Sequence, residues 1–585
     1  MLESVDFSAE ALSKEEFKPA YKQLVRKLVV LQQEARKAGI GLVVLFEGWG
    51  GAGKGSRISD LMYELDARAA SVHVTPDFDT EALRDFPGLP WGVTGYYPVM
   101  QEFWQALGER GTMTFYDRGW YTAAIDQALF EIACGGAKKP KKKAKGASAD
   151  LGATLLEGAA KARGEFHGDV VDTYRRMAHG FEKELVSDGY VVIKFFVHVS
   201  RDAQRKRLKR LRSDPNTAWR VSDGKLAQVK HYKEAYALYE RLLEATNFDF
   251  APWTLVNGED RLAANMRIAE TLVEAIEHAL AAQPDEAALA AQAKAAANAA
   301  RASREATAAA APAEDGGWNQ AALDEAHLQH SQAPRGSGYI IMAGYPRIDH
   351  SRPKPVLEPE RYKALLKQEQ RRFGALELEM YRKRVPLMLM YEGWDAAGKG
   401  GNIKRVAQAI DARAYTVFPS PAPTKPELLH PFLWRYWTRL PKAGHVGIYD
   451  RSWYGRVLVE RVEGFASPEE WGRAYDEING FELQLVQWGA VLLKFWVDIT
   501  PEEQLRRFEA RRDDPAKAWK ITDEDWRNRG KYPQYKQAVD DMFRLTSTEF
   551  APWTVLESDD KRYARVQALR IVNDALEARL RGGGA

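Results

Sequence analysis

Short apolar runs of strand length alternate with amphipathic patterns of helix length along most of the chain. The runs LVVLFEG from Leu42 and LMLMYEG from Leu387 are each followed by a glycine-rich segment and then by apolar residues at helical spacing. In the second case these residues lie at i, i+3, i+4 and i+7 from Ile403, so one face of the helix is expected to pack on a sheet. This alternation is typical of a parallel sheet with helices on both faces, which predicts an α/β fold.

The same order of motifs occurs twice along the chain. FYDRGWY at 115–121 corresponds to IYDRSWY at 448–454, and KFFVHVS at 194–200 corresponds to KFWVDIT at 494–500. Matching strands with matching neighbours indicate a tandem duplication rather than a coincidence of short motifs.

The repeats predict two domains, at 1–280 and 336–585, joined by an alanine-rich and partly helical linker over 281–335. The first repeat also contains a lysine-rich insertion around 135–153. This insertion fits either an exposed tether or an arm that binds a polyanion.

The glycine-rich segment of the second repeat matches the phosphate-loop (Walker A) pattern G-x-x-x-x-G-K, from Gly393 to Lys399. In this pattern, backbone N–H groups and the N-terminus of the following helix surround phosphate oxygens, and the lysine contacts a terminal oxygen. The expected phosphate-binding positions also include Ala397, Gly398 and Gly400. The order of strand, loop and helix predicts a P-loop kinase fold, duplicated in tandem.

Two features distinguish this loop from that of an ordinary nucleoside triphosphatase. The serine or threonine that normally follows the lysine and binds Mg²⁺ is replaced by Gly400. An acid, Asp395, lies inside the loop, where phosphates repel a carboxylate unless a cation lies between them. We expect Asp395 to bind Mg²⁺; the alternative is a turn residue whose carboxylate accepts backbone N–H bonds.

A second acid, Asp450, ends the apolar run HVGIY, which places it at the carboxyl edge of a strand beside the loop. We expect it to share the metal with Asp395. Arg451 and Arg456 follow and offer guanidinium groups to phosphate oxygens, with a structural ion pair as the alternative. Glu460 is a candidate contact to the acceptor nucleotide or a further acidic ligand.

A basic helix is predicted to begin after Thr500, in a capping box with proline at the first helical position. The cations of this helix and of the segment beyond it are candidate phosphate ligands: Arg507, Arg511, Arg512, Lys517 and Lys520. Its position after a core strand favours a lid that closes over phosphate. A solvated helix face is the alternative, because glutamates dilute the charge.

Three segments together resemble the second family of polyphosphate kinases in its tandem two-domain form: GWDAAGKGG from Gly393, YDRSWYGRVLVERV from Tyr449 and DPAKAWK from Asp514. The resemblance implies a P-loop kinase fold with a helical lid. It also implies phosphoryl transfer between inorganic polyphosphate and a nucleotide, with AMP as acceptor in the tandem form.

The same resemblance implies roles for the matching residues. Asp395 and Asp450 would organise Mg²⁺, Lys399 and Arg451 would hold the transferring phosphoryl group, and the lid arginines would cover it. An AMP phosphate already offers an anionic oxygen as nucleophile, so no catalytic base is required.

The first repeat has Gly50 in place of the loop acid, Thr122 and Ala123 in place of Gly455 and Arg456, and Gln127 in place of Glu460. It keeps Lys54, Asp117 and Arg118. We expect this repeat to be weakly active or inactive, and to act as a structural partner or as a surface that holds polyphosphate.

Charge and composition narrow the function classes. The 84 Lys and Arg residues against 81 Asp and Glu give a net charge of +3, so no global field attracts nucleic acid or a membrane. The single cysteine, Cys134, excludes an intrachain disulfide and a multi-thiolate metal site. No apolar run approaches the ~20 residues that span a bilayer, and the N-terminal residues do not resemble a signal peptide. We expect a cytoplasmic protein.

The expected activity is Mg²⁺-dependent transfer of phosphate from polyphosphate to AMP, giving ADP and reversible in principle. The alternatives are a polyphosphate-dependent nucleoside diphosphate kinase, an ATP-dependent nucleotide kinase and a non-catalytic polyphosphate-binding scaffold. The expected partners are polyphosphate and an adenine nucleotide, without nucleic acid or membrane, and a homodimer is left open. Five aromatic residues near the site offer either stacking surfaces for a base or core packing: Trp434, Tyr436, Trp437, Trp453 and Tyr454.

Overall fold

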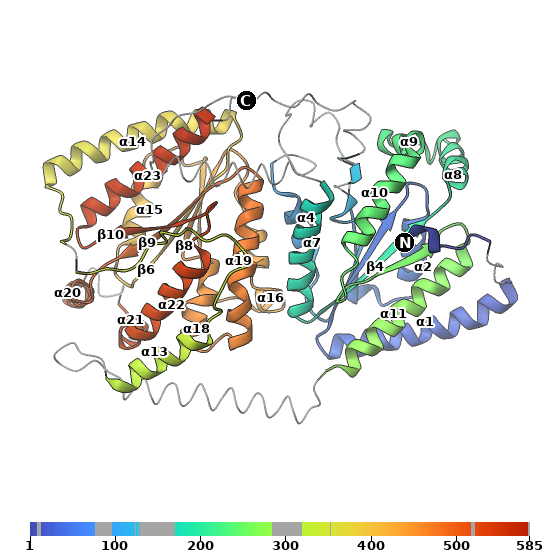
Figure 1. Ribbon diagram of the computed structural model, residues 1–585, viewed down its shortest axis with the longest axis horizontal. Coiled ribbons are helices and arrows are strands. Elements are labelled where there is room, and N and C mark those ends of the chain that lie inside the picture. Colours follow the sequence, from blue (N-terminus) through green and yellow to red (C-terminus); the bar gives the residue numbers. More distant parts are fainter. Residues whose placement is uncertain are drawn as a thin grey trace. The chain divides into compact units, whose positions relative to one another are not determined.

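The computed structural model describes residues 1–8, 13–75, 96–122, 125, 126, 128, 170–283, 319–351, 353–515 and 521–582. These residues form two compact units. The first unit holds the described residues up to 283 together with Thr424–Thr438, and the second holds the other described residues from 319 onward. Figure 1 shows the elements of each unit.

Each unit contains a five-stranded parallel sheet, and the strand order is the same in both. In the first unit the order is β2-β3-β1-β4-β5, and in the second it is β7-β8-β6-β9-β10 when read from the corresponding edge. The strands of the first sheet are β1 Gly41–Gly48, β2 Ala70–Val74, β3 Met113–Asp117, β4 Tyr190–His198 and β5 Trp253–Asn257. Those of the second are β6 Leu387–Gly393, β7 Tyr415–Pro419, β8 Val446–Asp450, β9 Val491–Asp498 and β10 Trp553–Glu557.

Helices cover both faces of each sheet (Figure 1). The first unit has α1 Lys14–Lys37, α2 Lys54–Met62, α4 Val99–Ala106, α7 Val170–Ser187, α8 Arg201–Ser213, α9 Asp223–Lys230, α10 Tyr232–Ala245, α11 Arg261–Ala281, α16 Lys425–Leu428 and α17 Trp434–Trp437. The second has α13 Gln320–Gln332, α14 Pro359–Arg382, α15 Lys399–Ala407, α18 Val459–Val462, α19 Pro468–Gln487, α20 Pro501–Arg512, α21 Asp523–Gly530, α22 Tyr532–Thr546 and α23 Lys561–Gly582. Short 3-10 helices are η1 Leu2–Ser4, η2 Ala67–Ala69, η3 Ala218–Arg220 and η4 Trp453–Val457.

The central strand of each sheet is apolar along its length because both of its faces are covered. All eight residues of β1 are buried, and so are the first six of β6. In the second sheet, Tyr391 of β6 lies opposite Asp450 of β8, while Gly393 lies opposite Val497 of β9. The carboxyl ends of β6 and β8 therefore meet at the point where the strand order reverses, which is where open parallel sheets bind ligands.

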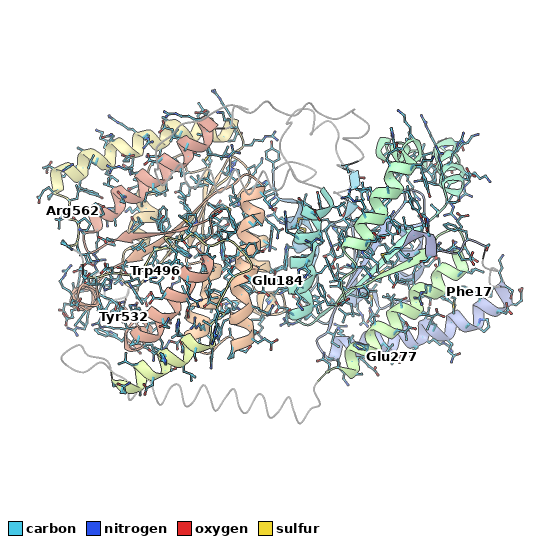
Figure 2. All side chains as sticks on the ribbon, viewed as in Figure 1. Phe17, Glu184, Glu277, Trp496, Tyr532 and Arg562 are labelled. Carbon is cyan, nitrogen blue, oxygen red and sulfur yellow. The ribbon has the colours of Figure 1, made fainter. Side chains whose placement is uncertain are left out.

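A pair of long helices packs together in each unit, α1 with α11 in the first and α14 with α23 in the second. An ion pair of 2.7 Å between Lys27 and Glu277 joins the first pair, and one of 2.6 Å between Arg372 and Asp574 joins the second. Figure 2 labels Glu277 on α11. The repeat detected in the sequence thus extends to the outer helices.

The predicted α/β fold, with a flanked parallel sheet duplicated in tandem, is confirmed. Of the residues predicted to form a linker, 319–335 include α13, which packs against α22; residues 284–318 lie outside the described part of the chain. The lysine-rich insertion and Cys134 also lie outside it. In the part that the structure describes, no helix is both long and apolar enough to cross a membrane.

Candidate active site

The loop between β6 and α15 has the backbone shape that a phosphate loop requires. Gly393 and Gly398 have φ angles of 143° and 113°, and a Cβ atom on Gly393 would lie 2.2 Å from the carbonyl oxygen of Val497. Glycine is needed at these two positions. A Cβ on Gly400 would meet nothing within 4 Å. At the start of α15, the N–H groups of Gly401 and Asn402 donate to the carbonyl oxygen of Gly398 at 3.0 and 3.2 Å. Those of Lys399 and Gly400 have no backbone partner among the described residues, so they remain available to phosphate oxygens.

Lys399 begins α15 and folds back over the loop. Its Nζ donates to the carbonyl oxygens of Gly393 at 2.7 Å and of Trp394 at 3.2 Å. Burial lowers the pKa of Lys399, and the charge of Arg451 acts in the same direction, while Asp395 and Asp450 oppose the shift. The predicted lysine, arginine and two carboxylates are therefore brought together in one place.

The loop acid is held by two side chains from distant parts of the chain. Asp395 Oδ1 accepts from Arg451 Nη2 at 3.0 Å, and its Oδ2 accepts from Asn528 Nδ2 of α21 at 2.8 Å. Gln504 of α20 donates to the backbone oxygen of Asp395 at 3.2 Å. The guanidinium of Arg451 supplies the countercharge that a carboxylate in this loop needs.

The bend after β8 fixes the position of Arg451. This residue has a φ of 62°, in the left-handed region that favours glycine over residues with a side chain. Ser452 donates from its backbone N and from its Oγ to Glu392 Oε1 at 2.7 and 2.8 Å. Burial raises the pKa of Glu392. These contacts hold the strained bend in place.

Trp453 and Tyr454 belong to the core beneath the site. Trp453 Nε1 and Tyr454 OH donate to Glu482 Oε1 at 3.0 and 2.7 Å, and Lys494 Nζ donates to Glu482 Oε2 at 2.7 Å. The side chains of Glu482 and Lys494 are fully buried. The two aromatic rings are therefore packing residues, and neither is exposed to stack on a base.

The same buried cluster occurs in the first unit. Its members are Trp120, Tyr121, Glu182 and Lys194, joined by the corresponding hydrogen bonds. A buried ion pair is costly to desolvate, so both charges need these additional hydrogen bonds. The cluster is part of the common scaffold.

A second aromatic group lies beside the loop. Trp394 stacks on Tyr532 with ring centroids 4.7 Å apart and meets Trp496 edge-on at 5.2 Å. Figure 2 labels Tyr532 and Trp496. The Nε1 of Trp394 donates to Asp498 Oδ1 at 2.8 Å. These contacts anchor the residue before Asp395 to β9 and α22.

Arg507, predicted to contact phosphate, contacts the phosphate loop in this structure. Its Nη1 donates to the carbonyl oxygens of Ala396 and Ala397 at 3.0 and 2.8 Å. Its Nη2 donates to those of Ser558 and Asp559, and its Nε donates to Glu503. All five N–H donors of the guanidinium are engaged, and the side chain is 3% exposed. Arg507 has no donor left for a ligand in this conformation.

The other predicted lid cations are placed differently. Arg512 is exposed and pairs with Asp513 at 3.1 Å, and Arg511 is half-buried. Lys517 and Lys520 lie outside the described residues.

Arg456 and Glu460 pair with each other. Arg456 Nε lies 2.9 Å from Glu460 Oε2, and its Nη1 lies 3.7 Å from Glu470 Oε1. The predicted phosphate contact and the predicted acceptor contact thus form an ion pair with each other, and their roles toward ligands stay predictions.

The donor set fits Mg²⁺ bound together with substrate. Within the described ranges, no group of three or more His, Cys, Asp or Glu residues could hold a metal by itself. The carboxylates of Asp395 and Asp450 both act to raise the pKa of Lys399. Mg²⁺ usually takes one or two carboxylates and completes its six oxygen ligands with water and substrate phosphates, so two acids suffice.

The corresponding loop of the first unit is closed where the acid would lie. A Cβ on Gly50 would be 2.7 Å from Cγ of Lys225 and 3.1 Å from Oε1 of Gln228. The N–H of Gly50 donates to that same Gln228 oxygen at 2.9 Å. Lys54 keeps the contacts of Lys399, with bonds to the carbonyl oxygens of the loop at 2.8 and 3.1 Å, and burial lowers its pKa to about 8.

Without a loop acid, the arginine after β3 has a different partner. Arg118 Nη2 donates to the carbonyl oxygen of Thr75 at 2.7 Å. Thr122 donates to Glu47, whose pKa burial raises to about 7. Ala123 and Gln127 lie outside the described residues.

His198 is the counterpart of Asp498 in the first unit. Its Nδ1 accepts from Trp49 Nε1 at 2.8 Å, which requires a neutral ring, and burial lowers its pKa to about 4. The stability that depends on the neutral ring is fully present above the ordinary pKa of about 6.5. It is lost as the pH falls from there toward 4.

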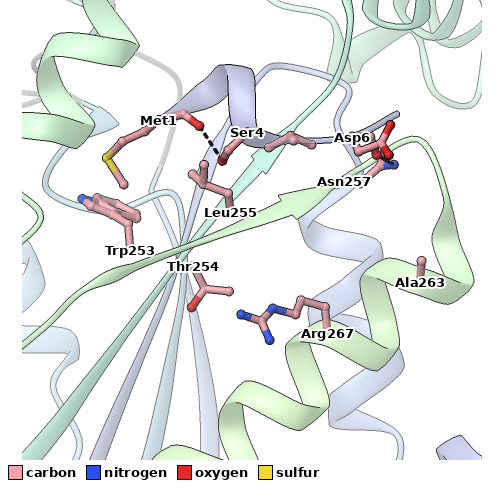
Figure 3. Close-up of a pocket in the computed structure, with 10 residues that line it drawn as sticks. Met1, Ser4, Asp6, Trp253, Thr254, Leu255, Asn257, Ala263 and Arg267 are labelled. Atoms are coloured by element: carbon pink, nitrogen blue, oxygen red, sulfur yellow. Dashed lines mark hydrogen bonds between the residues drawn. The ribbon is translucent and has the colours of Figure 1, made fainter. Parts of the chain in front are cut away.

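A hollow of about 480 Å³ lies elsewhere in the first unit, beside the edge strand β5 and under the N-terminal segment (Figure 3). Ser4 Oγ donates to the carbonyl oxygen of Met1 at 2.8 Å on its rim, and Arg267 and Thr254 line its wall. None of its lining residues belongs to a phosphate loop or to the strands β1 and β3 that flank the first loop.

Sequence reasoning missed Asn528 and Gln504. Neither belongs to a motif with a fixed spacing to the loop. Their counterparts Gln228 and Gln204 also contact the first loop, so alignment of the two repeats is the signal that could have found them.

Comparison with known proteins adds three findings. The model of the family described as polyphosphate kinase 2 matches residues 11–139, 167–284 and 356–582. The polyphosphate:AMP phosphotransferases of Pseudomonas aeruginosa and Pseudomonas syringae pv. tomato are each 34% identical to the chain; the first match covers 99% of both chains, and the second covers 95% of this chain and 93% of the relative. A crystal structure assigned to polyphosphate kinase 2 from Pseudomonas aeruginosa PA01 is 32% identical, covers 99% of both chains and superposes with a TM-score of 0.72.

Proposed function

Because this chain belongs to the polyphosphate kinase 2 family, we propose that it transfers a phosphoryl group from inorganic polyphosphate to AMP, giving ADP. The observation that carries the proposal is the similarity to two polyphosphate:AMP phosphotransferases over nearly the full length, through both repeats. The substrates of the proposal are polyphosphate and AMP. AMP is an intracellular metabolite, so the proposed place of action is the cytoplasm.

The reaction exchanges one phosphorus–oxygen bond for another. An anionic oxygen of the AMP phosphate forms a bond to the terminal phosphorus of polyphosphate, and the bond from that phosphorus to the bridging oxygen breaks. The products are ADP and a polyphosphate that is one phosphate shorter. Because the nucleophile is already ionised, the chain needs to position both substrates and neutralise charge.

The residues of the second repeat provide these two functions. The amides around Gly393, Ala397, Gly398 and Gly400 would bind phosphate oxygens through the helix N-terminus. Lys399 and Arg451 would lie on the transferring group, after Lys399 leaves the loop carbonyls and Arg451 leaves Asp395.

The metal and the outer contacts complete the proposal. Asp395 and Asp450 would hold Mg²⁺, which when bound neutralises phosphate charge. Arg456, Arg511 and Arg512 are the remaining cations for the polyphosphate chain, and Glu460 is the proposed acceptor contact. Arg507 is left out because all five of its donors are engaged and its side chain is 3% exposed, whereas the side chain of Arg451 is 41% exposed.

We assign catalysis to the second repeat. Its loop has an acid with two partners, whereas Lys225 and Gln228 fill the corresponding space at Gly50. A first repeat without the acid cannot provide the second carboxylate for a metal.

Product analysis of the purified chain with Mg²⁺ tests this proposal. AMP, ADP or GDP is offered as acceptor, with polyphosphate or ATP as the only donor. ADP formed from AMP and polyphosphate, lost in Lys399→Met and retained in the matched variant Lys54→Met, is the expected result. Turnover with ATP alone would indicate an ATP-dependent kinase, and loss of activity in Lys54→Met only would assign catalysis to the first repeat.

A further inference from the structure

The first unit carries a helix with a large excess of positive charge. α8 contains seven cations and a single acid, Asp202. Its counterpart α20 contains four arginines and three glutamates. The two helices follow corresponding strands, β4 and β9, so the same position in the fold has a different charge in the two units.

The excess charge lies on the outward face of α8. Gln204 and Leu208 are buried, and Arg207 donates to the carbonyl oxygens of Ala52 and Gly258, so this side of the helix packs on the unit. The other six cations are exposed and define the α8 basic face: Arg201, Arg205, Lys206, Lys209, Arg210 and Arg212.

Four members of the α8 basic face form a stripe along the helix. They lie at i, i+4, i+8 and i+11, beginning with Arg201, and therefore share one side. At about 1.5 Å of rise per residue, the stripe extends about 16 Å. This length suits a chain of several phosphate groups better than a single phosphate.

Acids that neutralise α20 have no equivalent on α8. In the second unit Glu503 pairs with Arg506 at 2.7 Å, and Asp513 pairs with Arg512 at 3.1 Å. The corresponding residues of the first unit are Ala203 and Ser213. Among the residues that the structure describes, no ion pair involves a member of the α8 basic face. Cations gathered in this way create a local positive potential that attracts polyanions.

We infer that the α8 basic face is a non-catalytic binding site for inorganic polyphosphate, an inference that rests on the proposed function for the choice of polyanion. A linear polyanion without bases needs only cations at repeated intervals. α8 itself has no aromatic residue, and Trp219, which follows it, is a single exposed ring with the guanidinium of Arg220 5.2 Å over one face. Single-stranded nucleic acids are usually bound on several open aromatic faces.

Such a site would keep a long polyphosphate chain on the molecule between turnovers. Binding of one part of a chain raises the effective concentration of the rest of that chain for the catalytic loop on the same protein. The first repeat would then contribute to the use of long chains although it lacks the loop acid.

The test measures binding separately from turnover. The full chain with Asp395→Asn is titrated with labelled long-chain polyphosphate at several salt concentrations, with and without Arg205→Gln, Lys209→Gln and Arg212→Gln. A matched control removes three exposed cations of α1 in the same unit, with Lys18→Gln, Lys22→Gln and Arg26→Gln. Thermal melting confirms that the variants are folded, and Lys206→Gln with Arg210→Gln serves as a second α8 variant.

The α8 variant should bind polyphosphate at least tenfold more weakly, and the slope of log K against log salt should fall by about 2, at ~0.7 per lost contact. In the active chain, the KM for polyphosphate should rise while kcat and the KM for AMP stay the same. Equal binding by the α8 and control variants would overturn the inference, as would tighter binding of single-stranded RNA than of polyphosphate to this face. Binding at α8 without any polyphosphate-dependent turnover would instead reject the proposed function and leave this site standing.

Discussion

Arg507 offers the sharpest test of how the site is built, because its sequence position indicates a phosphate ligand and its contacts indicate a scaffold residue. Arg507→Met keeps an unbranched side chain that matches the aliphatic part of arginine and removes all five donors. The carbonyl oxygens of Ala396, Ala397, Ser558 and Asp559 would lose a charged partner in a buried place. The phosphate loop and the segment before α23 would no longer be tied together.

The magnitude follows from the number and burial of these bonds. A hydrogen bond to a charged group contributes about 1.5–3 kcal/mol, and removal of one partner from a buried charged contact costs about 3–5 kcal/mol. The four carbonyl bonds depend on one guanidinium, so their values do not add, and we expect a loss of about 3–5 kcal/mol. For a unit of this size, 1 kcal/mol corresponds to about 2–4 °C, which predicts a Tm lower by roughly 6–20 °C.

The assay is thermal melting without phosphate ligands, compared across three variants. Arg506→Met removes a neighbouring arginine that is 67% exposed and whose one ion-pair partner in the described part of the chain is Glu503, and should change the Tm by about 2 °C or less. Arg207→Met repeats the change in the first unit, where this arginine contacts the carbonyl oxygens of Ala52, Gly258 and Glu259, and should destabilise that unit. If Arg507→Met melts like the wild-type chain and loses only affinity for polyphosphate, Arg507 is a phosphate ligand and the reasoning is wrong.

Three further predictions concern the phosphate loops of the two units and the buried His198 of the first. Asn528→Ala frees one oxygen of Asp395 and should lower kcat about tenfold, or about 1.4 kcal/mol, with weaker apparent Mg²⁺ affinity; steady-state kinetics with unchanged values would contradict this. Gly50→Asp forces a side chain into filled space, so melting should show a loss of about 1–3 kcal/mol, and an assay in the Asp395→Asn background should show no gain of turnover. The free energy of unfolding of the first unit should fall by at most about 2 kcal/mol as the pH is lowered from 6.5 to 5, because His198 binds a proton in the unfolded state but not in the buried site. Thermal melts across this pH range should lose the dependence in His198→Asp.

The sequence was most informative where one strand or one loop sets the geometry. Apolar runs of strand length identified β6, β8 and β9, and the strand–loop–helix order placed Lys399 at the start of α15. Asp450 follows directly from its place at the end of a strand beside β6. In these cases neighbours along the chain determine the position of the side chain.

The partners of these residues depend on the tertiary fold and were not predicted. Asp395 and Arg451 were both candidates, but their mutual hydrogen bond depends on how β8 ends beside the loop. Arg507 lies on α20, where arginines and glutamates are interspersed and few apolar residues mark the buried face. The burial of Arg507 could therefore not be recognised from the spacing of residues. Asn528 belongs to no motif, and only the fold brings α21 to the loop acid.

Because the fold occurs twice in one chain, a comparison of the two units distinguishes contacts that stabilise the fold from contacts that serve the reaction. The buried Glu182–Lys194 and Glu482–Lys494 pairs occur in both units, and so does the arginine that ties the phosphate loop. A contact that persists in the unit without a loop acid must stabilise the fold, whatever else it does. The loop acid and the hydrogen bonds to its carboxylate occur only in the second unit, where Asn528 donates to Asp395. Its counterpart Gln228 instead accepts from the backbone amide of Gly50. Substitutions in the shared set should therefore lower the melting temperature of their own unit, while substitutions in the unshared set should affect turnover more than stability.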